Sequence, residues 1–250
     1  MSKQGLFLTL ILCLTGAAHA AGGGALLHYE VDTSNKASVQ RGAANFMNYC
    51  SGCHSLKYLR YGRMAEDNEI PEGLLKENLM FTSTKPGEPI KSAMPSEAAA
   101  NWFGQVPPDL SLTARARGAD WIYSFLKTFY LDPSKPTGVN NKQLAGASMP
   151  HVLGQLEGYK VPVESHGEEE DHGHGGHGGH SGPKFEIVQA GLLSPAEYDR
   201  FVGDITNFLS YAAEPGKETM HSRGKWALLY IFLLIPLTYM IKREFWKDVH

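Results

Sequence analysis

The feature that most constrains this chain of 250 residues is the run Cys50-Ser51-Gly52-Cys53-His54. A C-x-x-C-H run is the signature for covalent attachment of a c-type haem. Thiols three residues apart lie on one face of a helical turn, where both reach the haem vinyl groups while the next residue is held against the iron. The run therefore predicts a haem attached at Cys50 and Cys53, with His54 as the proximal iron ligand.

Two other uses of a C-x-x-C pair are a thioredoxin-like redox site and one half of a zinc site. A zinc site requires another Cys or His pair at ligand spacing, and a redox dithiol does not require the histidine. The third cysteine, Cys13, lies in a segment that we expect to be removed. The residues therefore favour haem attachment over both alternatives.

The first 20 residues have the pattern of a signal peptide. Lys3 supplies the positive charge, residues 6–14 are nearly all apolar, and Ala18-His19-Ala20 places small residues at the cleavage positions. The mature chain is then expected to begin at Ala21, without Cys13.

A second apolar run, WALLYIFLLIPLTYMI, extends from Trp226 to Ile241 and contains no charged residue. As a helix its sixteen residues span about 24 Å, less than the roughly 30 Å hydrocarbon core of a bilayer. Lys225 and Lys242 can extend to the headgroups and compensate for the difference. We expect a transmembrane helix over 225–242, and the alternative is a buried core helix.

The topology follows from the two ends of the chain. If the signal peptide is cleaved and one span remains, residues 21–224 form an exported haem domain and residues 243–250 form a cytoplasmic tail. In a bacterium this predicts a single-pass protein of the inner membrane with its haem domain in the periplasm.

The exported part has about two hundred residues, which is enough for one domain with a sizeable core. The formal net charge is −3 and no stripe of Lys and Arg is present, which argues against a nucleic-acid partner. Alternation typical of strands is sparse, so we expect a mainly α fold in which long loops join the helices.

Four helices are expected. The first covers about Ser38 to Tyr49, with Ser38 as N-cap, and the second covers about Leu112 to Tyr130, where aromatic residues recur at helical spacing. The third begins at Ser194-Pro195, an N-cap followed by a first-turn proline, and ends before Pro215. The membrane helix is the fourth.

Residues 164–182 combine glycine, acidic residues and histidines without apolar side chains. Such a composition cannot bury enough surface to order itself, so we expect a flexible loop. Metal binding by its imidazoles and carboxylates is the functional alternative.

The second axial ligand decides what a haem protein can do. A haem with one protein ligand can bind small molecules, whereas a haem with His and Met ligands is closed to them and suited to electron transfer. Met149-Pro150 and Met94-Pro95 are the two candidate pairs. The small residues before Met149 let the backbone run close to a macrocycle, which favours Met149 but leaves Met94 open.

Five segments in this order resemble the cytochrome c1 family, and together they cover nearly the whole mature chain. They are RGAANFMNYCSGCHSLKYLRYGRM, PPDLSLTARARGADWIYSFLKTFY, ASMPHVLGQLEGY, LSPAEYDRFVGDITNFLSYAAEP and, after the membrane span, KREFWKDVH. The resemblance implies a cytochrome c-like helical haem domain with one C-terminal transmembrane helix. Residues 164–182 differ from the family pattern, so no role is transferred to them.

The resemblance also implies roles for individual residues. In the family the motif histidine and the Met of the later Met-Pro segment hold the iron, which carries over to His54 and Met149. The Pro-Pro-Asp-Leu-Ser block of the family lies against the haem, which points to Pro107 and Pro108. An arginine of the following Ala-Arg pair lies near a haem propionate, which corresponds to Arg117, with Arg115 as the alternative.

The function that the resemblance implies is that of an electron-transfer subunit in ubiquinol:cytochrome c reductase, the cytochrome bc1 complex of respiration or photosynthesis. One haem c would pass one electron from the Rieske iron-sulfur cluster to cytochrome c, beside cytochrome b, in a complex expected to be dimeric. No set of residues suited to act as a general base or nucleophile is apparent, so the chain alone is an electron carrier. Acidic residues such as Glu66, Asp67 and Glu69 could steer a basic cytochrome c or be ordinary surface.

Two alternatives stay open. One is a haem subunit of another membrane oxidoreductase, such as a terminal oxidase or nitrogen-oxide reductase. The other is a catalytic or gas-sensing haem protein, which requires an open sixth position on the iron.

Overall fold

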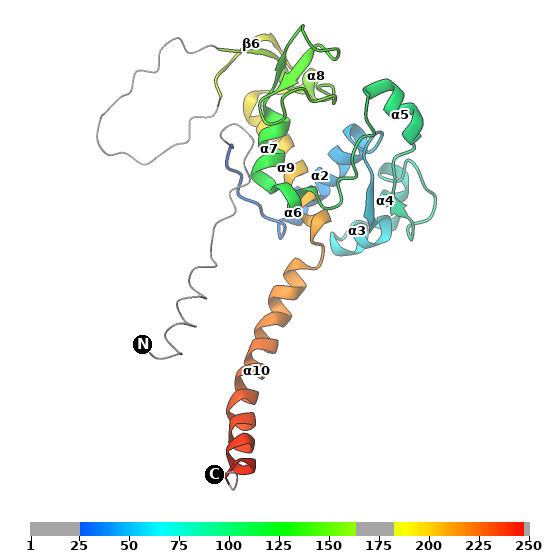
Figure 1. Cartoon of the computed structure of the whole chain (residues 1–250). Helices are drawn as coiled ribbons and strands as arrows, with labels where there is room; N and C mark the ends of the chain where they lie inside the picture. Colours follow the sequence, from blue (N-terminus) through cyan, green and yellow to red (C-terminus); the bar gives the residue numbers. More distant parts are fainter. Residues whose placement is uncertain (1–25, 164–182, 248–250) are drawn as a thin grey trace, which may run out of the picture.

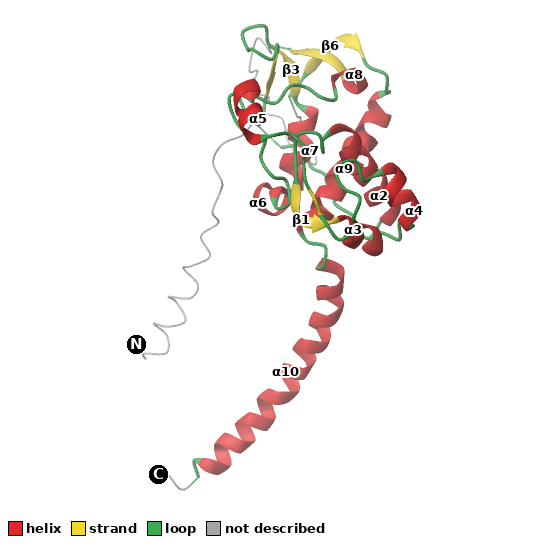
Figure 2. Cartoon of the chain, turned by 90° about the vertical axis from the view of Figure 1, so that its right-hand side faces the viewer, coloured by secondary structure: helices red, strands yellow, loops and turns green. Residues whose placement is uncertain are grey.

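The computed structural model describes residues 26–163 and 183–247. Figure 2 shows that helices make up most of the regular structure, which confirms the expected mainly α class. The elements are α2 (Lys36–Tyr49), β1 (Leu56–Arg60), α3 (Tyr61–Asp67), α4 (Glu72–Asn78), β2 (Pro89–Ile90), α5 (Ser96–Phe103), α6 (Thr113–Arg117), α7 (Ala119–Lys127), β3 (Phe129–Leu131), β4 (Val139–Asn141), α8 (Gly154–Glu157), β5 (Gly158–Pro162), β6 (Phe185–Ala190), α9 (Pro195–Ala213) and α10 (Lys217–Phe245).

The strands form three small antiparallel pairs, β1 with β2, β3 with β4 and β5 with β6. These short strand pairs are consistent with the expected mainly α fold, in which long loops join the helices. The expected signal peptide (1–20) and the His-rich segment (164–182) lie outside the described residues.

The domain is organised around the crossing of α2 and α9, two helices from opposite ends of its sequence (Figure 1). The backbones come into direct contact at Gly42. A Cβ atom at this position would lie 1.9 Å from the carbonyl oxygen of Asp204 and 2.7 Å from the Cβ of Phe208. Helices separated by side chains usually pack 8–10 Å apart, so a glycine is required for this closer approach.

The buried carboxylate of Asp204 stabilises the same crossing through hydrogen bonds. The guanidinium of Arg41 donates to both carboxylate oxygens of Asp204, at 2.7 and 2.8 Å, and the hydroxyl of Ser38 donates to the same carboxylate at 2.5 Å. The amide of Asn207 donates to the Ser38 hydroxyl at 2.8 Å. Since a buried carboxylate is tolerated only when it is paired, these bonds hold α2 in one orientation against α9.

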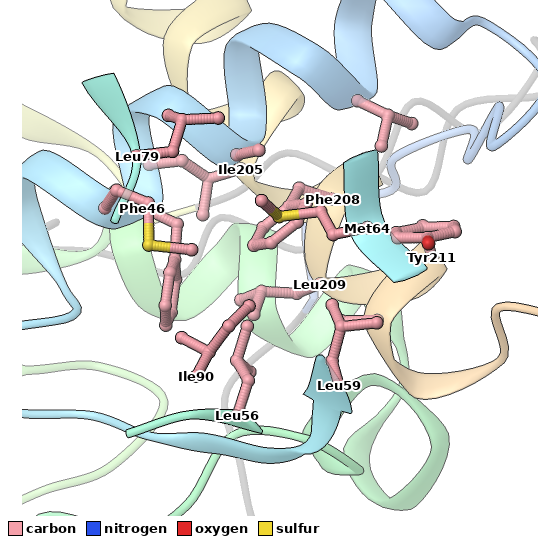
Figure 3. Packing of buried hydrophobic residues seen from close by; sticks show 14 of the residues in the cluster. Phe46, Leu56, Leu59, Met64, Leu79, Ile90, Ile205, Phe208, Leu209 and Tyr211 are labelled. Atoms are coloured by element: carbon pink, nitrogen blue, oxygen red, sulfur yellow. The ribbon is translucent and has the colours of Figure 1, made fainter. Parts of the chain in front are cut away.

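An apolar core fills the space beside the crossing (Figure 3). The ring of Phe46 in α2 packs on that of Phe208 in α9, with centroids 5.5 Å apart. Side chains from β1, α3, α4, β2 and α9 complete this cluster: Leu56, Leu59, Met64, Leu79, Ile90, Ile205 and Leu209. This packing fixes β1, which leads away from the C-x-x-C-H turn.

Two of the expected helices differ in detail from the structure. The first begins at Lys36 rather than Ser38, because the Asn35 side chain caps it and accepts a hydrogen bond from the Ser38 amide at 3.1 Å. The continuous helix expected over 112–130 is wrong. The chain adopts φ +87° at Gly118, which separates α6 from α7, and it becomes strand β3 at Phe129.

The third expected helix is confirmed as α9. The Ser194 hydroxyl caps the amide of Glu197, the Glu197 carboxylate accepts from the Ser194 amide, and Pro195 occupies the first turn. The helix ends at Ala213, with Glu214 as its C-cap, just before Pro215.

Helix α10 extends well beyond the apolar run from which it was predicted. The segment Thr219–Phe245 has 27 residues, or about 40 Å of helix, and none of its most apolar window is buried. Figure 1 shows α10 projecting away from the globular part. The alternative of a core helix is therefore wrong for α10, and its length exceeds the roughly 30 Å that a bilayer core requires.

Candidate functional site

The C-x-x-C-H run forms the turn that ends α2. Cys50 is the C-cap of the helix, and its carbonyl oxygen accepts hydrogen bonds from the amides of Cys53 at 3.1 Å and His54 at 2.9 Å. Cys50 and Cys53 do not form a disulfide with each other. Burial, with a smaller effect of Cys53, raises the pKa of the Cys50 thiol to about 12. A redox-active dithiol needs a lowered pKa, so this environment does not suit thioredoxin-like chemistry.

His54 is oriented by a backbone carbonyl. Its Nδ1 lies 2.7 Å from the carbonyl oxygen of Pro108, which can only accept, so Nδ1 carries the proton and Nε2 keeps a free lone pair. Burial lowers the pKa of His54, while the bond to Pro108 partly offsets this effect. A neutral imidazole with its second nitrogen fixed in this way is the usual form of a metal-ligating histidine.

The segment Pro107–Ser111 is held beside the residues that follow the haem motif. The Leu110 amide donates to the Ser55 carbonyl at 2.9 Å, the Asp109 carboxylate accepts from the Lys57 amide at 2.9 Å, and Ser111 Oγ accepts from the Tyr58 amide at 3.1 Å. These bonds bring Pro108 to His54. Sequence reasoning missed this role of the Pro108 carbonyl, because a backbone acceptor leaves no side-chain signal.

Three separate segments line one cleft. It has an empty volume of about 560 Å3, including its open mouth. Its lining comes from the end of α2, from the loop after α5 and from the loop before α8: Tyr49, Cys50, Cys53, His54, Phe103, Gln105, Pro107, Pro108, Ser148, Met149, Pro150 and Val152. Most of this lining is apolar.

The cleft brings together six of the seven residues predicted to bind the cofactor: Cys50, Cys53, His54, Pro107, Pro108 and Met149. Met94, the alternative to Met149, is not among the described residues that line it. The Met94 backbone amide donates a hydrogen bond to Ser92 Oγ at 3.1 Å. The Ser92 hydroxyl in turn donates to the carbonyl oxygen of Gly52. The structure therefore makes Met149 the available thioether, and iron ligation by Met149 stays a prediction.

The chemistry of this donor set fits a c-type haem. Two thiols lie at the attachment spacing, a neutral imidazole nitrogen is free, and a thioether reaches the same apolar cleft from another segment. Imidazole and thioether together are the ligands of closed, electron-transferring haems.

Arg117 lies elsewhere. Its guanidinium carbon stands 5.0 Å from the ring centroid of Trp121, at the start of a row in which Trp121 stacks on Phe125 and Phe125 meets Phe129 edge to face. Arg117 is not among the cleft-lining residues, and a contact with a propionate stays a prediction. The alternative, Arg115, is exposed and lies 3.9 Å from the carboxylate of Glu214.

Two residues of the acidic cluster have partners within the domain. Asp67 accepts from Arg63 at 2.6 Å and from the Tyr211 hydroxyl at 2.8 Å, and Glu69 accepts from Lys36 at 2.5 Å. These pairings favour ordinary surface over a docking site for a basic partner.

Comparison with known proteins gives consistent matches. The profile of the cytochrome c1 family matches residues 28–159 and 191–249. The chain is 47% identical over 250 residues to a cytochrome c1 of Allochromatium vinosum, covering 100% of both chains. It is 37% identical over 246 residues to a protein of Nitrosomonas europaea named ammonia monooxygenase gamma subunit, covering 97% of both.

A more distant match is a cytochrome c1 of Rhodospirillum rubrum, 30% identical over 270 residues and covering 96% of this chain and 94% of that one. The interval between the two matched parts of the family profile contains β6 and residues 164–182. This is the same region whose composition differs from the family pattern.

Proposed function

The chain belongs to the cytochrome c1 family, and from that premise we propose that it passes one electron from a Rieske iron-sulfur cluster to cytochrome c in a cytochrome bc1 complex. Family membership makes it a bc1-type electron-transfer subunit with a covalently bound c-type haem. It is thus a subunit of an oxidoreductase, of the ubiquinol:cytochrome c type, and by itself an electron carrier. The haem supplies reversible one-electron redox chemistry at its iron.

The residues of the chain would bind and orient this group. Cys50 and Cys53 would hold it through thioether bonds, and His54 would ligate the iron through Nε2 because Pro108 engages Nδ1. Met149 would occupy the sixth position and exclude small molecules, and Arg117 would balance a propionate charge. The observation that carries the proposal is that His54 and Met149 line the same apolar cleft.

Within residues 26–163 and 183–247, α10 is the one helix long and apolar enough to cross a membrane, and it would anchor the haem domain there. We propose that residues 1–20 are a cleaved signal peptide, that 21–224 form a periplasmic domain, that 225–242 span the bacterial inner membrane and that 243–250 are cytoplasmic. An amino-terminal sequence beginning at Ala21 and digestion of the domain by protease in spheroplasts would support this topology. Protection of the domain in spheroplasts would refute it.

The proposed partners are cytochrome b and the Rieske protein within a dimeric complex, with cytochrome c as acceptor. One curated relative, 26% identical over 241 residues, is named cytochrome b/c1. Purification of the membrane complex through a tag on this chain should yield a b-type cytochrome, a Rieske protein and quinol oxidation that antimycin inhibits. Purification without them would refute the assignment.

The sixth ligand has its own test. The oxidised wild-type protein should show a sulfur-to-iron charge-transfer band, and the reduced protein should not bind carbon monoxide. Met149→Leu should lose the band and bind carbon monoxide, while Met94→Leu, the matched control, should keep the wild-type spectrum. Ready binding of carbon monoxide by the wild type would refute the electron-carrier proposal and favour a catalytic or gas-sensing haem.

A haem subunit of another membrane oxidoreductase is the second candidate. It is favoured by the relative named ammonia monooxygenase gamma subunit, which aligns over 97% of both chains. The same purification separates the two, because copper or non-haem iron subunits in place of the Rieske protein would support this candidate.

A further inference from the structure

A buried group of three ionisable side chains includes His151, which lies two positions after Met149 in the chain. His151 Nε2 is 3.0 Å from Oε2 of Glu157, and the ammonium of Lys160 donates to the other oxygen, Oε1, of the same carboxylate. The side chains of His151, Glu157 and Lys160 are only 4%, 11% and 9% exposed. Such burial is costly unless every charged member keeps its partner, so the arrangement is strongly specified.

Aromatic packing fixes the histidine ring of this group. The ring of His151 stacks on that of Phe129, with centroids 5.0 Å apart and planes 7° from parallel, and Tyr159 meets it edge to face at 6.2 Å. Phe129 is 1% exposed and belongs to β3. His151 is therefore fixed by aromatic packing, with its Nε2 at 3.0 Å from the Glu157 carboxylate.

The group is joined to the rest of the domain through Lys160. Its ammonium donates to the carbonyl oxygen of Lys127 at 2.7 Å and lies 4.7 Å from the ring centroid of Phe185. Lys127 ends α7, Lys160 lies in β5 and Phe185 begins β6. The position of His151 is thus tied to three elements outside the Met149 loop.

A single residue, Pro150, separates His151 from Met149 along the chain. At 3.8 Å between consecutive Cα atoms, the Met149 Cα lies at most about 7.6 Å from that of His151. Pro150 restricts φ and removes one degree of freedom from this link. Fixing His151 therefore limits how far the backbone at Met149 can move from the cleft that Met149 lines.

We propose that His151, Glu157 and Lys160 act as a positioning group that holds Met149 at the haem iron. This inference rests on the proposed function, because it takes Met149 as the sixth ligand. None of the three touches the iron; they determine whether the thioether stays in place. Loosening the group should open the sixth position without removing the covalently attached haem.

The test uses the full-length protein with haem, solubilised from membranes. Glu157→Leu removes the shared acceptor, and Glu157→Gln keeps its size and one acceptor oxygen. Asp67→Asn is the matched control, because Asp67 accepts from Arg63 and Tyr211, and neither of these partners contacts His151, Glu157 or Lys160. For each variant we would measure the haem content, the charge-transfer band, the carbon monoxide-reactive fraction and the midpoint potential.

We expect Glu157→Leu to raise the carbon monoxide-reactive fraction at least tenfold, to weaken the band and to retain haem. Glu157→Gln and Asp67→Asn should stay close to wild type. If the variant weakens thioether binding tenfold more in the reduced than in the oxidised state of the iron, the midpoint potential falls by about 59 mV. If Glu157→Leu fails to assemble, His151→Phe carries the test, since it keeps the ring on Phe129 and loses the contact with Glu157.

Two results separate this inference from the proposed function. If Met149→Leu loses the band while the Glu157 and His151 variants keep it and stay closed to carbon monoxide, the positioning group is refuted and the ligand assignment stands. If Met149→Leu itself keeps the band, the ligand assignment fails and the inference fails with it.

Discussion

Substitution of Gly42 by alanine tests whether the close approach of α2 and α9 holds the haem-binding end of the domain together. The new Cβ would lie 1.9 Å from the Asp204 carbonyl oxygen, whereas Cβ atoms are essentially not found within 3.0 Å of other heavy atoms. The helices must therefore separate locally by at least 1.1 Å. The obstacle is backbone, so no side-chain rotation relieves the clash.

The expected destabilisation follows from two costs and one gain. Overpacking of a core costs about 1–3 kcal/mol, and stretching the hydrogen bonds between Arg41 and Asp204 costs about 1.5–3 kcal/mol. Replacing a helical glycine by alanine returns about 0.5–1 kcal/mol. The net loss is about 3 kcal/mol, which lowers Tm by roughly 6–12 °C for a domain of about 200 residues.

Thermal unfolding of the detergent-solubilised protein with haem, followed by circular dichroism, measures this loss. Gly73→Ala is the matched control, because Gly73 lies in α4 and an added Cβ there meets nothing within 4 Å. The control should leave Tm unchanged or slightly raised. A Gly42→Ala protein as stable as Gly73→Ala would refute the reasoning and show that the crossing adapts without cost.

Three further predictions concern α9 and α10. Ser194→Ala removes the N-cap of α9 and should lower the free energy of unfolding by about 1 kcal/mol, measured by urea titration. Hydrogen bonds from the Ser194 hydroxyl and amide lower the pKa of Glu197 below its unfolded value of 4.5. The contribution of this carboxylate to the free energy of unfolding should therefore be present above pH 4.5 and be lost as the pH falls through the folded pKa. A difference in stability between wild type and Glu197→Gln that persists in acid would contradict this. A chain ending at Gly216 should be released from the membrane with wild-type Tm, since α10 is exposed throughout its apolar part, and loss of folding on truncation would show that α10 supports the domain.

Features set by neighbouring residues could be predicted from the sequence. The C-x-x-C-H turn, the capping box of α9 and the apolar stretch of α10 each depend on contacts within a few positions, and the structure contains all three elements. The helix expected over 112–130 was wrong, because the backbone turns at Gly118, before the aromatic periodicity begins at Trp121, and the chain becomes a strand at Phe129. Local pattern indicates which residues face inward but not where the chain changes direction.

By itself the sequence determined the cofactor class, the family and the membrane anchor, because these depend on covalent spacing, on the order of motifs and on the length of an apolar run. Only the tertiary structure decided which methionine shares a cleft with His54, where Arg117 lies and which group confines Met149. Those outcomes depend on side chains far apart in the chain, such as His54 with Pro108 or Phe129 with His151, which come together only when the whole domain packs.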